Sequence, residues 1–186
     1  MDFAAKFDEG LLYNDFLQKY GSDEHQRRWA AVHSEVHLTT AQQELLNGFV
    51  REIKVLVSAG AWCGDCVNQC PILDHFSAQT DKVAIRYFDR DDQPDLTKEL
   101  MVCGGSRVPA VLFLSEDGFP CGRYGDRTLS KYRQMASEQI GAACPTGLIP
   151  PEQSLLQDVT QEWLDEFERI QLMLRLSGRL RQIHGD

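Results

Sequence analysis

The chain has 186 residues, of which 42% are hydrophobic and 25% are charged, which is enough to bury one sizeable core. Its formal net charge of -9 argues against a surface that neutralises phosphates, so we expect no nucleic-acid partner. No apolar stretch approaches the roughly 18 residues of a membrane span, and the segment from Met1 to Glu9 lacks the basic and apolar regions of a signal peptide. We therefore expect a cytoplasmic protein that has no membrane partner.

The first 50 residues have a helical pattern, with apolar side chains recurring at near 3.6-residue spacing. Gly21 breaks this pattern, and a further helix should begin at a capping threonine, Thr39 or Thr40. We predict an N-terminal helical extension over residues 1–50.

A short β-branched run from Ile53 to Ser58 begins the middle of the chain. It predicts a strand that leads through a turn into a helix beginning near Cys63 and ending at about Phe76. Because Pro71 lies inside this helix and lacks an N–H group, it should kink or interrupt the hydrogen-bond ladder.

The remaining middle part alternates between strands and helices. An almost purely apolar run from Ala110 to Leu114 predicts a central strand that is covered on both faces. A turn with Gly118 should join it to a returning strand. The other predicted elements are a strand over 83–88, a helix over 94–101, a strand over 120–124 and a helix over 129–140. Together these elements spell β-α-β-α-β-β-α, which we interpret as one domain over residues 51–144.

In the last part, residues 145–186, the segment from Pro145 to Pro151 is rich in proline and glycine, which disfavour helices and strands. We predict a linker there, followed by a long helix. Apolar residues recur there three and four positions apart and form one stripe. We predict that this stripe docks on the body of the protein, with a dimer or a partner helix as the alternative. The stripe consists of Leu156, Val159, Trp163, Phe167, Ile170 and Leu174.

The six cysteines are unevenly distributed. Cys63, Cys66 and Cys70 are close together, whereas the other three are scattered. This distribution favours one reactive site and ordinary buried thiols in a reducing compartment over a disulfide framework. The scattered cysteines are Cys103, Cys121 and Cys144.

Cys63 and Cys66 form a Cys-x-x-Cys motif at a predicted strand-to-helix turn. A thiol at a helix N-terminus should have a lowered pKa, because unsatisfied N–H groups and the helix dipole favour negative charge there. Cys63 is therefore the candidate nucleophile, and Cys66, one turn further on, the resolving thiol. The alternative is half of a zinc site, which needs four ligands and would have to recruit others such as Cys70, His75 or Cys103.

The run from Trp62 to Cys66 after an apolar strand, together with Val108-Pro109 before the next one, resembles the thioredoxin family. The resemblance extends from about residue 53 to residue 140, and bacterial members with helical extensions are the most similar. It implies an α/β thioredoxin fold, a central mixed sheet flanked by helices, to which the two ends of this chain add further helices. It also implies that Pro109 is cis, and that Trp62, Val108 and Pro109 contact the substrate.

Two departures from the family pattern affect the predicted site. Thioredoxins have Gly-Pro between the cysteines, whereas this chain has Gly64 and Asp65, which we assign supporting roles. Val57 occupies the position at which thioredoxins bury an aspartate that helps to deprotonate the resolving thiol. Cys66 would then need another proton acceptor, for which Asp65 or a water molecule is the candidate, and the rate could be low.

Two further cysteines and two histidines could also be reactive or bind a metal. Cys70 shares a helix face with Cys66 and is predicted to be an inert buried thiol, with a secondary disulfide as the alternative. Cys103 lies near the expected substrate face and is a candidate third reactive thiol. His33 and His37 have a spacing that suits a metal, yet we interpret them as surface or packing residues.

We predict a thiol–disulfide oxidoreductase that reduces disulfides in protein or small-thiol substrates, using an electron donor that the sequence does not identify. No cofactor or metal is expected. One alternative is a thioredoxin-fold binding or adapter module without significant redox turnover, and another is a thiolate carrier of a metal or cluster.

Overall fold

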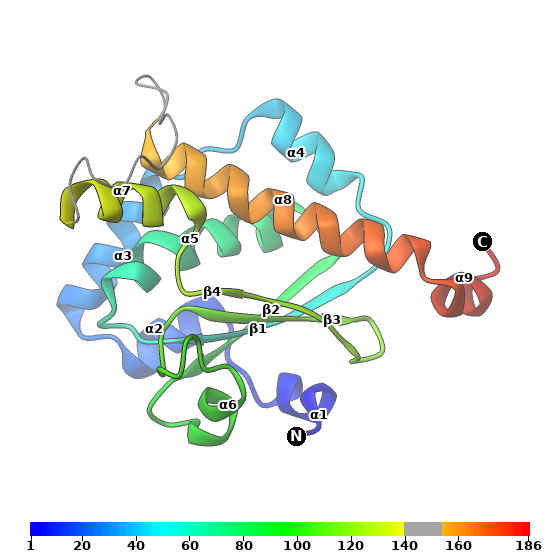
Figure 1. Ribbon diagram of the computed structural model, residues 1–186, viewed down its shortest axis with the longest axis horizontal. Coiled ribbons are helices and arrows are strands. Elements are labelled where there is room, and N and C mark those ends of the chain that lie inside the picture. The colour runs from blue at the N-terminus through cyan, green and yellow to red at the C-terminus, as the bar shows by residue number, and fades with distance from the viewer. Residues whose placement is uncertain (140–153) are drawn as a thin grey trace.

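In the computed structural model of the protein, residues 1–139 and 154–186 are described. A four-stranded sheet in the order β2-β1-β3-β4 forms its centre (Figure 1). β1 runs parallel to β2 and antiparallel to β3, and β3 runs antiparallel to β4. This mixed sheet confirms the predicted α/β fold class. The strands are β1 (Ile53–Ala59), β2 (Val83–Asp89), β3 (Ala110–Ser115) and β4 (Pro120–Gly125).

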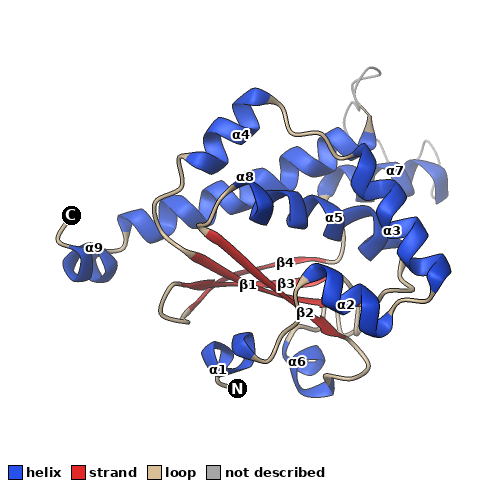
Figure 2. Cartoon of the chain, turned by 180° about the vertical axis from the view of Figure 1, so that it is seen from behind, coloured by secondary structure: helices blue, strands red, loops and turns tan. Residues whose placement is uncertain are grey.

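Helices cover both faces of the sheet. One face carries α5 together with α3, α4 and α8, and the other carries α1 and α6, as Figure 2 shows from behind. Thr39 caps α4 through its side chain, as the sequence predicted. The helices up to α7 are α1 (Phe3–Asp8), α2 (Tyr13–Tyr20), α3 (Asp23–Glu35), α4 (Thr40–Asn47), α5 (Gly64–Gln79), α6 (Pro94–Glu99) and α7 (Leu129–Gln139).

The two faces of the sheet bury separate apolar clusters. Successive side chains of a strand point to opposite faces. Val55 and Val57 of β1 therefore join the larger cluster, which contains side chains of α2, α3, α5 and α8. Leu56 joins the smaller cluster, which contains Phe7 of α1 and Leu96 of α6. All six residues of β3 are buried, which confirms the prediction of a strand covered on both faces.

Helix α5 continues without a break through Pro71 and ends at Gln79. The predicted continuation of the helix through Pro71 is confirmed, but the helix ends at Gln79 and not at about Phe76. An internal proline costs a helix about 3 kcal/mol. Burying a large apolar side chain stabilises the folded protein by about 1.5–3 kcal/mol. Ile72, Leu73 and Phe76 follow Pro71 in the helix and are fully buried, so their burial offsets the cost of the proline.

The apolar stripe of the last part docks on the body of the protein, as predicted. It lies on α8 (Leu155–Leu176), and Phe167 packs edge-on against Phe76 of α5 with 5.3 Å between the ring centroids. Gln171 exchanges hydrogen bonds with the backbone of Arg51, accepting from its N–H at 2.9 Å and donating to its carbonyl at 2.8 Å. Ser177 then ends α8 and caps a separate helix, α9 (Gly178–His184), which the sequence analysis did not predict.

Some expectations concern residues outside the described ranges. The linker from Pro145 to Pro151 and Cys144 lie there. Among the helices of 1–139 and 154–186, none has the length and apolar character needed to cross a membrane.

The docking of α8 can be tested with the same substitution at two positions of that helix. Leu164 is 1% exposed and Leu172 is 50% exposed. We expect Leu164→Ala to lower the free energy of unfolding by about 2–5 kcal/mol, because it leaves a cavity in the core. Leu172→Ala should change it by less than about 0.5 kcal/mol. Urea unfolding of the two variants measures the difference, and equal losses would mean that the buried side of α8 stabilises the protein no more than its exposed side.

Candidate active site

Cys63 lies at the junction of β1 and α5, where it forms the N-cap of the helix. The turn before it is fixed from two sides. Cys63 N–H donates to the carbonyl of Gly60 at 2.9 Å, and the buried indole N–H of Trp29 in α3 donates to the carbonyl of Ala61 at 2.8 Å. Gly60 is required by a close approach, because a Cβ there would lie 2.7 Å from the Trp62 ring. An N-terminal helix thus helps to position the dithiol.

Cys66 lies one turn inside α5 and is fully buried, whereas Cys63 is 8% exposed. The thiol of Cys66 is within hydrogen-bonding reach of both Cys63 and Cys70. The backbone N–H of Gly60 points at the Cys66 sulfur from 3.5 Å. Cys63 is therefore the more accessible thiol of the pair, and Cys66 faces the interior.

The segment before β3 lies directly against Cys63. The peptide bond between Val108 and Pro109 is cis, as predicted. The Cys63 thiol donates to the carbonyl oxygen of Val108 at 3.4 Å. The two sequence motifs, 45 residues apart in the chain, therefore meet at one place.

The pKa of Cys63 is raised, not lowered as the sequence analysis expected. Its hydrogen bond with Cys66, burial and the charge of Cys66 all raise the pKa, and they outweigh the backbone N–H groups of Asp65 and Cys66, which lower it. Burial also raises the pKa of Cys66. The N–H groups at the helix N-terminus do lower the pKa of Cys63, as predicted. The second thiol and the burial of the site outweigh them, so the pair resists forming a thiolate.

Asp65 forms an ion pair with Arg127, whose guanidinium is 2.6 Å from the carboxylate. This contact raises the pKa of Arg127. Among the described residues, no hydrogen bond joins the Asp65 carboxylate to Cys66, so nothing in the geometry supports its predicted role as a proton acceptor. Val57 is fully buried in the apolar core.

A second carboxylate, Asp126, stands just before Arg127 and is 3% exposed. Burial alone would raise the pKa of Asp126, but hydrogen bonds from Tyr132 and Arg107, together with the charge of Arg127, lower it overall. The Arg107 guanidinium is 3.1 Å from this carboxylate. Arg107 is also the residue directly before Val108.

Trp62 is 44% exposed and forms part of the surface beside Cys63. The guanidinium of Arg90 lies 4.6 Å above the centre of its ring, within the range of a cation–π interaction. Arg90 also donates to the carbonyl of Ser106 at 3.4 Å. It thereby links the turn after β2 to the segment that leads to Val108.

The sequence analysis did not identify several of these contacting residues: Trp29, Arg90, Arg107 and Arg127. Each arginine is far from the Cys-x-x-Cys motif in sequence, and no local pattern marks it. Trp29 offered one signal, because it is a large apolar residue in a mostly polar helix. In the structure it is fully buried.

The other candidate thiols and histidines are dispersed. Cys70 is fully buried, as predicted, whereas Cys103 is exposed. His33 pairs with Asp74 at 3.0 Å and stacks on His75, whereas His37 lies beyond the end of α3. Across 1–139 and 154–186, no three His, Cys, Asp or Glu side chains gather as metal ligands would.

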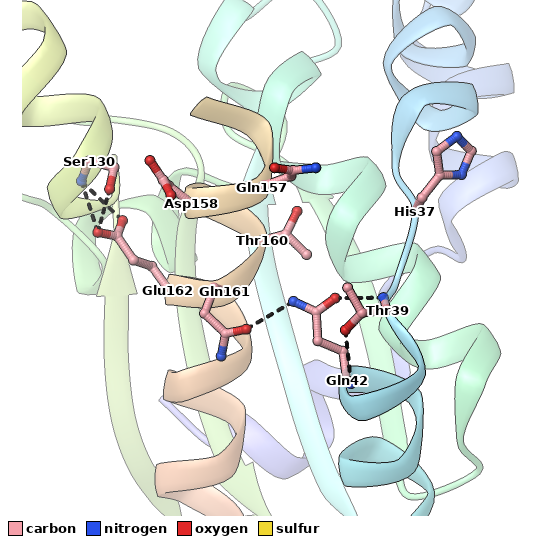
Figure 3. A pocket seen from close by; sticks show the side chains of 9 residues that line it. All are labelled: His37, Thr39, Gln42, Ser130, Gln157, Asp158, Thr160, Gln161 and Glu162. Atoms are coloured by element: carbon pink, nitrogen blue, oxygen red, sulfur yellow. Dashed lines mark hydrogen bonds between the residues drawn. The ribbon is translucent and has the colours of Figure 1, made fainter. Parts of the chain in front are cut away.

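A polar pocket of about 400 Å³ lies elsewhere, between α4 and the first turns of α8 (Figure 3). The side-chain amide of Gln42 donates to Gln161 across it at 2.9 Å, and Glu162 accepts from the backbone and the hydroxyl of Ser130. Several of its polar groups thus bind one another. None of its lining residues belongs to the dithiol turn or to the segment around Pro109.

Comparisons with known proteins agree with this geometry. A family model described as thioredoxin matches residues 10–138. A protein of unknown function from Pseudomonas aeruginosa has a similar structure, with a TM-score of 0.70, 20% identity, and coverage of 91% of this chain and 96% of the other. An HIV epitope-scaffold aligns with a TM-score of 0.66 and 20% identity over 90% of this chain and 99% of its own. No curated protein sequence matches the chain. At these identities the structural likenesses establish the fold alone.

The raised pKa of Cys63 predicts how its reactivity depends on pH. Only the thiolate is alkylated, so the rate should fall steeply as the pH drops below the raised pKa. In the reduced protein we expect the rate of iodoacetamide labelling at Cys63 to keep rising above about pH 9, beyond the ordinary pKa of about 8.5. Mass spectrometry of the Cys63 peptide measures this rate, with free N-acetylcysteine as the reference. A plateau below neutral pH would contradict the expectation.

Proposed function

This chain belongs to the thioredoxin family, and from that membership we propose that it is a thiol–disulfide oxidoreductase that reduces disulfides in protein or small-thiol substrates. The observation that carries the proposal is the placement of two reduced cysteines, Cys63 and Cys66, at the start of a buried helix, against the carbonyl of Val108. A structural pair of cysteines would not need an exposed tryptophan and a partly accessible first thiol beside it.

The proposed reaction proceeds in two exchanges. Cys63 loses its proton and attacks one sulfur of the substrate disulfide, so that this bond breaks and a mixed disulfide forms. The released substrate thiolate takes up a proton. Cys66 then loses its proton and attacks the Cys63 sulfur, which releases the second substrate thiol and leaves a Cys63–Cys66 disulfide. Two electrons pass to the substrate, and a separate dithiol donor restores the reduced pair.

The electrostatics of the pair favour reduction of substrates over oxidation. A dithiol whose thiolate is strongly stabilised holds its electrons and is an oxidant when it is a disulfide. In this chain the contacts raise the pKa of Cys63 and of Cys66 and do not stabilise the thiolate. The reduced form therefore lacks that stabilisation, and the pair should give up electrons readily.

The surface beside Cys63 supplies the proposed substrate contacts. Trp62 offers an exposed apolar ring next to Cys63 in the chain, and the segment of Val108 and Pro109 lies against the thiol. A substrate held between them would present its disulfide to the Cys63 sulfur. Gly64 adds no side chain at this entrance, and Asp65 is held aside by its ion pair with Arg127.

The function is tested by equilibrating the protein with a series of dithiothreitol ratios and reading the redox state by alkylation and mass spectrometry. We expect one reversible two-electron transition confined to Cys63 and Cys66. Its midpoint should be nearer to about -270 mV, as in a reducing thioredoxin, than to about -120 mV, as in a strong oxidant.

Two variants serve as controls for this titration. Cys63→Ser should abolish the transition, whereas Cys121→Ser, in β4, should leave it unchanged. The purified protein should also reduce a disulfide-bonded peptide when dithiothreitol is supplied. A pair that never forms a disulfide under any ratio would refute the oxidoreductase and leave the binding or adapter function.

A further inference from the structure

In the second exchange the Cys66 thiol must lose a proton, although it is fully buried. Three described groups approach its sulfur: the Cys63 thiol, the Cys70 thiol and the backbone N–H of Gly60. An N–H group can only donate, and at this stage the Cys63 sulfur is bonded to the substrate. The Cys70 sulfur is therefore the neighbouring atom that can accept the proton.

A stripe of three polar groups leads from Cys66 to the surface along α5. Cys66, Cys70 and Asp74 follow one another at intervals of four residues, which places them on one face of the helix, each about 6 Å further along its axis. Cys70 is fully buried, whereas the Asp74 side chain is 29% exposed and pairs with His33 of α3 at 3.0 Å. Asp74 and His33 line an open pocket of about 640 Å³ among α2, α3 and α5. The stripe therefore connects the buried thiol with solvent.

The hydroxyl of Tyr13, in α2, lies beside the middle of this stripe. Tyr13 lines the same pocket as Asp74. Its ring packs edge-on against Tyr87, and the Tyr87 hydroxyl donates to the carbonyl of Cys70 at 3.3 Å. Burial, followed by the charges of Cys70 and Asp74, raises the pKa of Tyr13, so its hydroxyl is close to both groups. Tyr13 thus bridges the gap between Cys70 and Asp74.

No structural partner explains the position of the Tyr13 hydroxyl among the described residues. Its oxygen is buried, and it forms no hydrogen bond with any of them. Buried polar groups are nearly always paired, because an unpaired one destabilises the fold. A phenylalanine would fill the same space without this cost. The hydroxyl therefore indicates a function other than stability.

We propose that a proton path serves the resolving thiol, Cys66, and that it consists of Cys70, Tyr13 and Asp74. The inference rests on the proposed oxidoreductase function and assigns the proton acceptor that its second exchange requires. As the Cys66 sulfur attacks Cys63, its proton passes to the Cys70 sulfur. The proton of Cys70 passes through the Tyr13 hydroxyl to the Asp74 carboxylate, which releases it to solvent in the pocket. Tyr13 stays uncharged throughout, because it accepts one proton while it donates another.

Three further titratable side chains face the path. The Tyr87 hydroxyl of β2 is engaged by a backbone carbonyl. His75, beside Asp74 in α5, has its Nε2 3.0 Å from the carbonyl of His33, and burial lowers its pKa. His33 itself contacts the Asp74 carboxylate at the pocket. Asp74 is therefore the anionic group that takes up the proton where the path meets solvent.

The experiment separates the two exchanges with dithiobis(nitrobenzoate), an aryl disulfide that releases a coloured thiolate. An excess is mixed with the reduced protein in a stopped-flow instrument, after Cys103, Cys121 and Cys144 have been replaced by Ser so that they do not react. The rate of the first phase, the attack by Cys63, depends on the reagent concentration, whereas that of the second, the attack by Cys66, does not. Because the proton of the second exchange stays inside the protein, we expect its rate to change less than about threefold between about pH 6 and about pH 8, where carboxylates are ionised.

Asp74→Asn removes the final acceptor, so the proton must leave directly to solution. The second phase should then be about a hundredfold slower at neutral pH and should become about tenfold faster for each pH unit. Tyr13→Phe, which removes only the unpaired hydroxyl, and Cys70→Ala should have the same effect, whereas Cys70→Ser should retain most of the rate. The first phase should not change in these variants, because Cys63 is partly exposed and can lose its proton to solvent.

Two matched variants serve as controls. Asp81→Asn makes the same charge change at an exposed position just beyond α5. Tyr20→Phe removes a hydroxyl at the other end of α2 from Tyr13. Both variants should leave the two phases unchanged.

The outcomes separate this inference from the function on which it rests. A protein that releases only one coloured thiolate forms no Cys63–Cys66 disulfide, so the oxidoreductase function is wrong and the inference fails with it. If the second phase appears but already becomes about tenfold faster for each pH unit in the parent protein, the function stands and the proton path is wrong. An unchanged second phase in Asp74→Asn or in Tyr13→Phe would overturn the path in the same way.

Discussion

The burial of α5 is the constraint on which the rest of the structure depends. A helix that is apolar on most sides must be covered on most sides, and here the sheet covers one side while α3 and α8 cover others. Gln69 shows how closely these layers are joined. Its amide donates to the carbonyl of Asp126 at 2.9 Å and accepts from the indole of Trp163 in α8 at 3.0 Å. The extensions at both ends of the chain are therefore part of what holds the dithiol in place.

Much of the fold could be predicted because its signals are local. The β-branched run of β1 and the apolar run of β3 each predicted a strand to within about one residue, since a buried strand needs little more than such a run. The stripe on α8 predicted its docked face for the same reason. The end of α5 at Gln79, beyond the predicted end at about Phe76, could not be predicted, because it depends on how the residues after the proline pack in the core.

The candidate site was predictable only in part, for a similar reason. The positions of Cys63 and Val108 follow from two short motifs, and the structure brings these residues into contact. The pKa of Cys63 depends on how closely Cys66 approaches it and on burial, neither of which can be read from a dipeptide between them. The partner of Asp65 lies 62 residues away, and nothing in the spacing marks Arg127 as that partner.

The exposure of Trp62 also makes the molecule optically informative. The chain has three tryptophans, and two of them, Trp29 and Trp163, are fully buried with their indole N–H groups bonded inside the protein. The fluorescence of these two buried indoles is emitted from an apolar environment and therefore at shorter wavelengths. Trp62 instead faces solvent beside a thiol and beneath the guanidinium of Arg90. The long-wavelength part of the intrinsic fluorescence therefore comes from one indole at the entrance to the site and reports what binds there, without any attached dye.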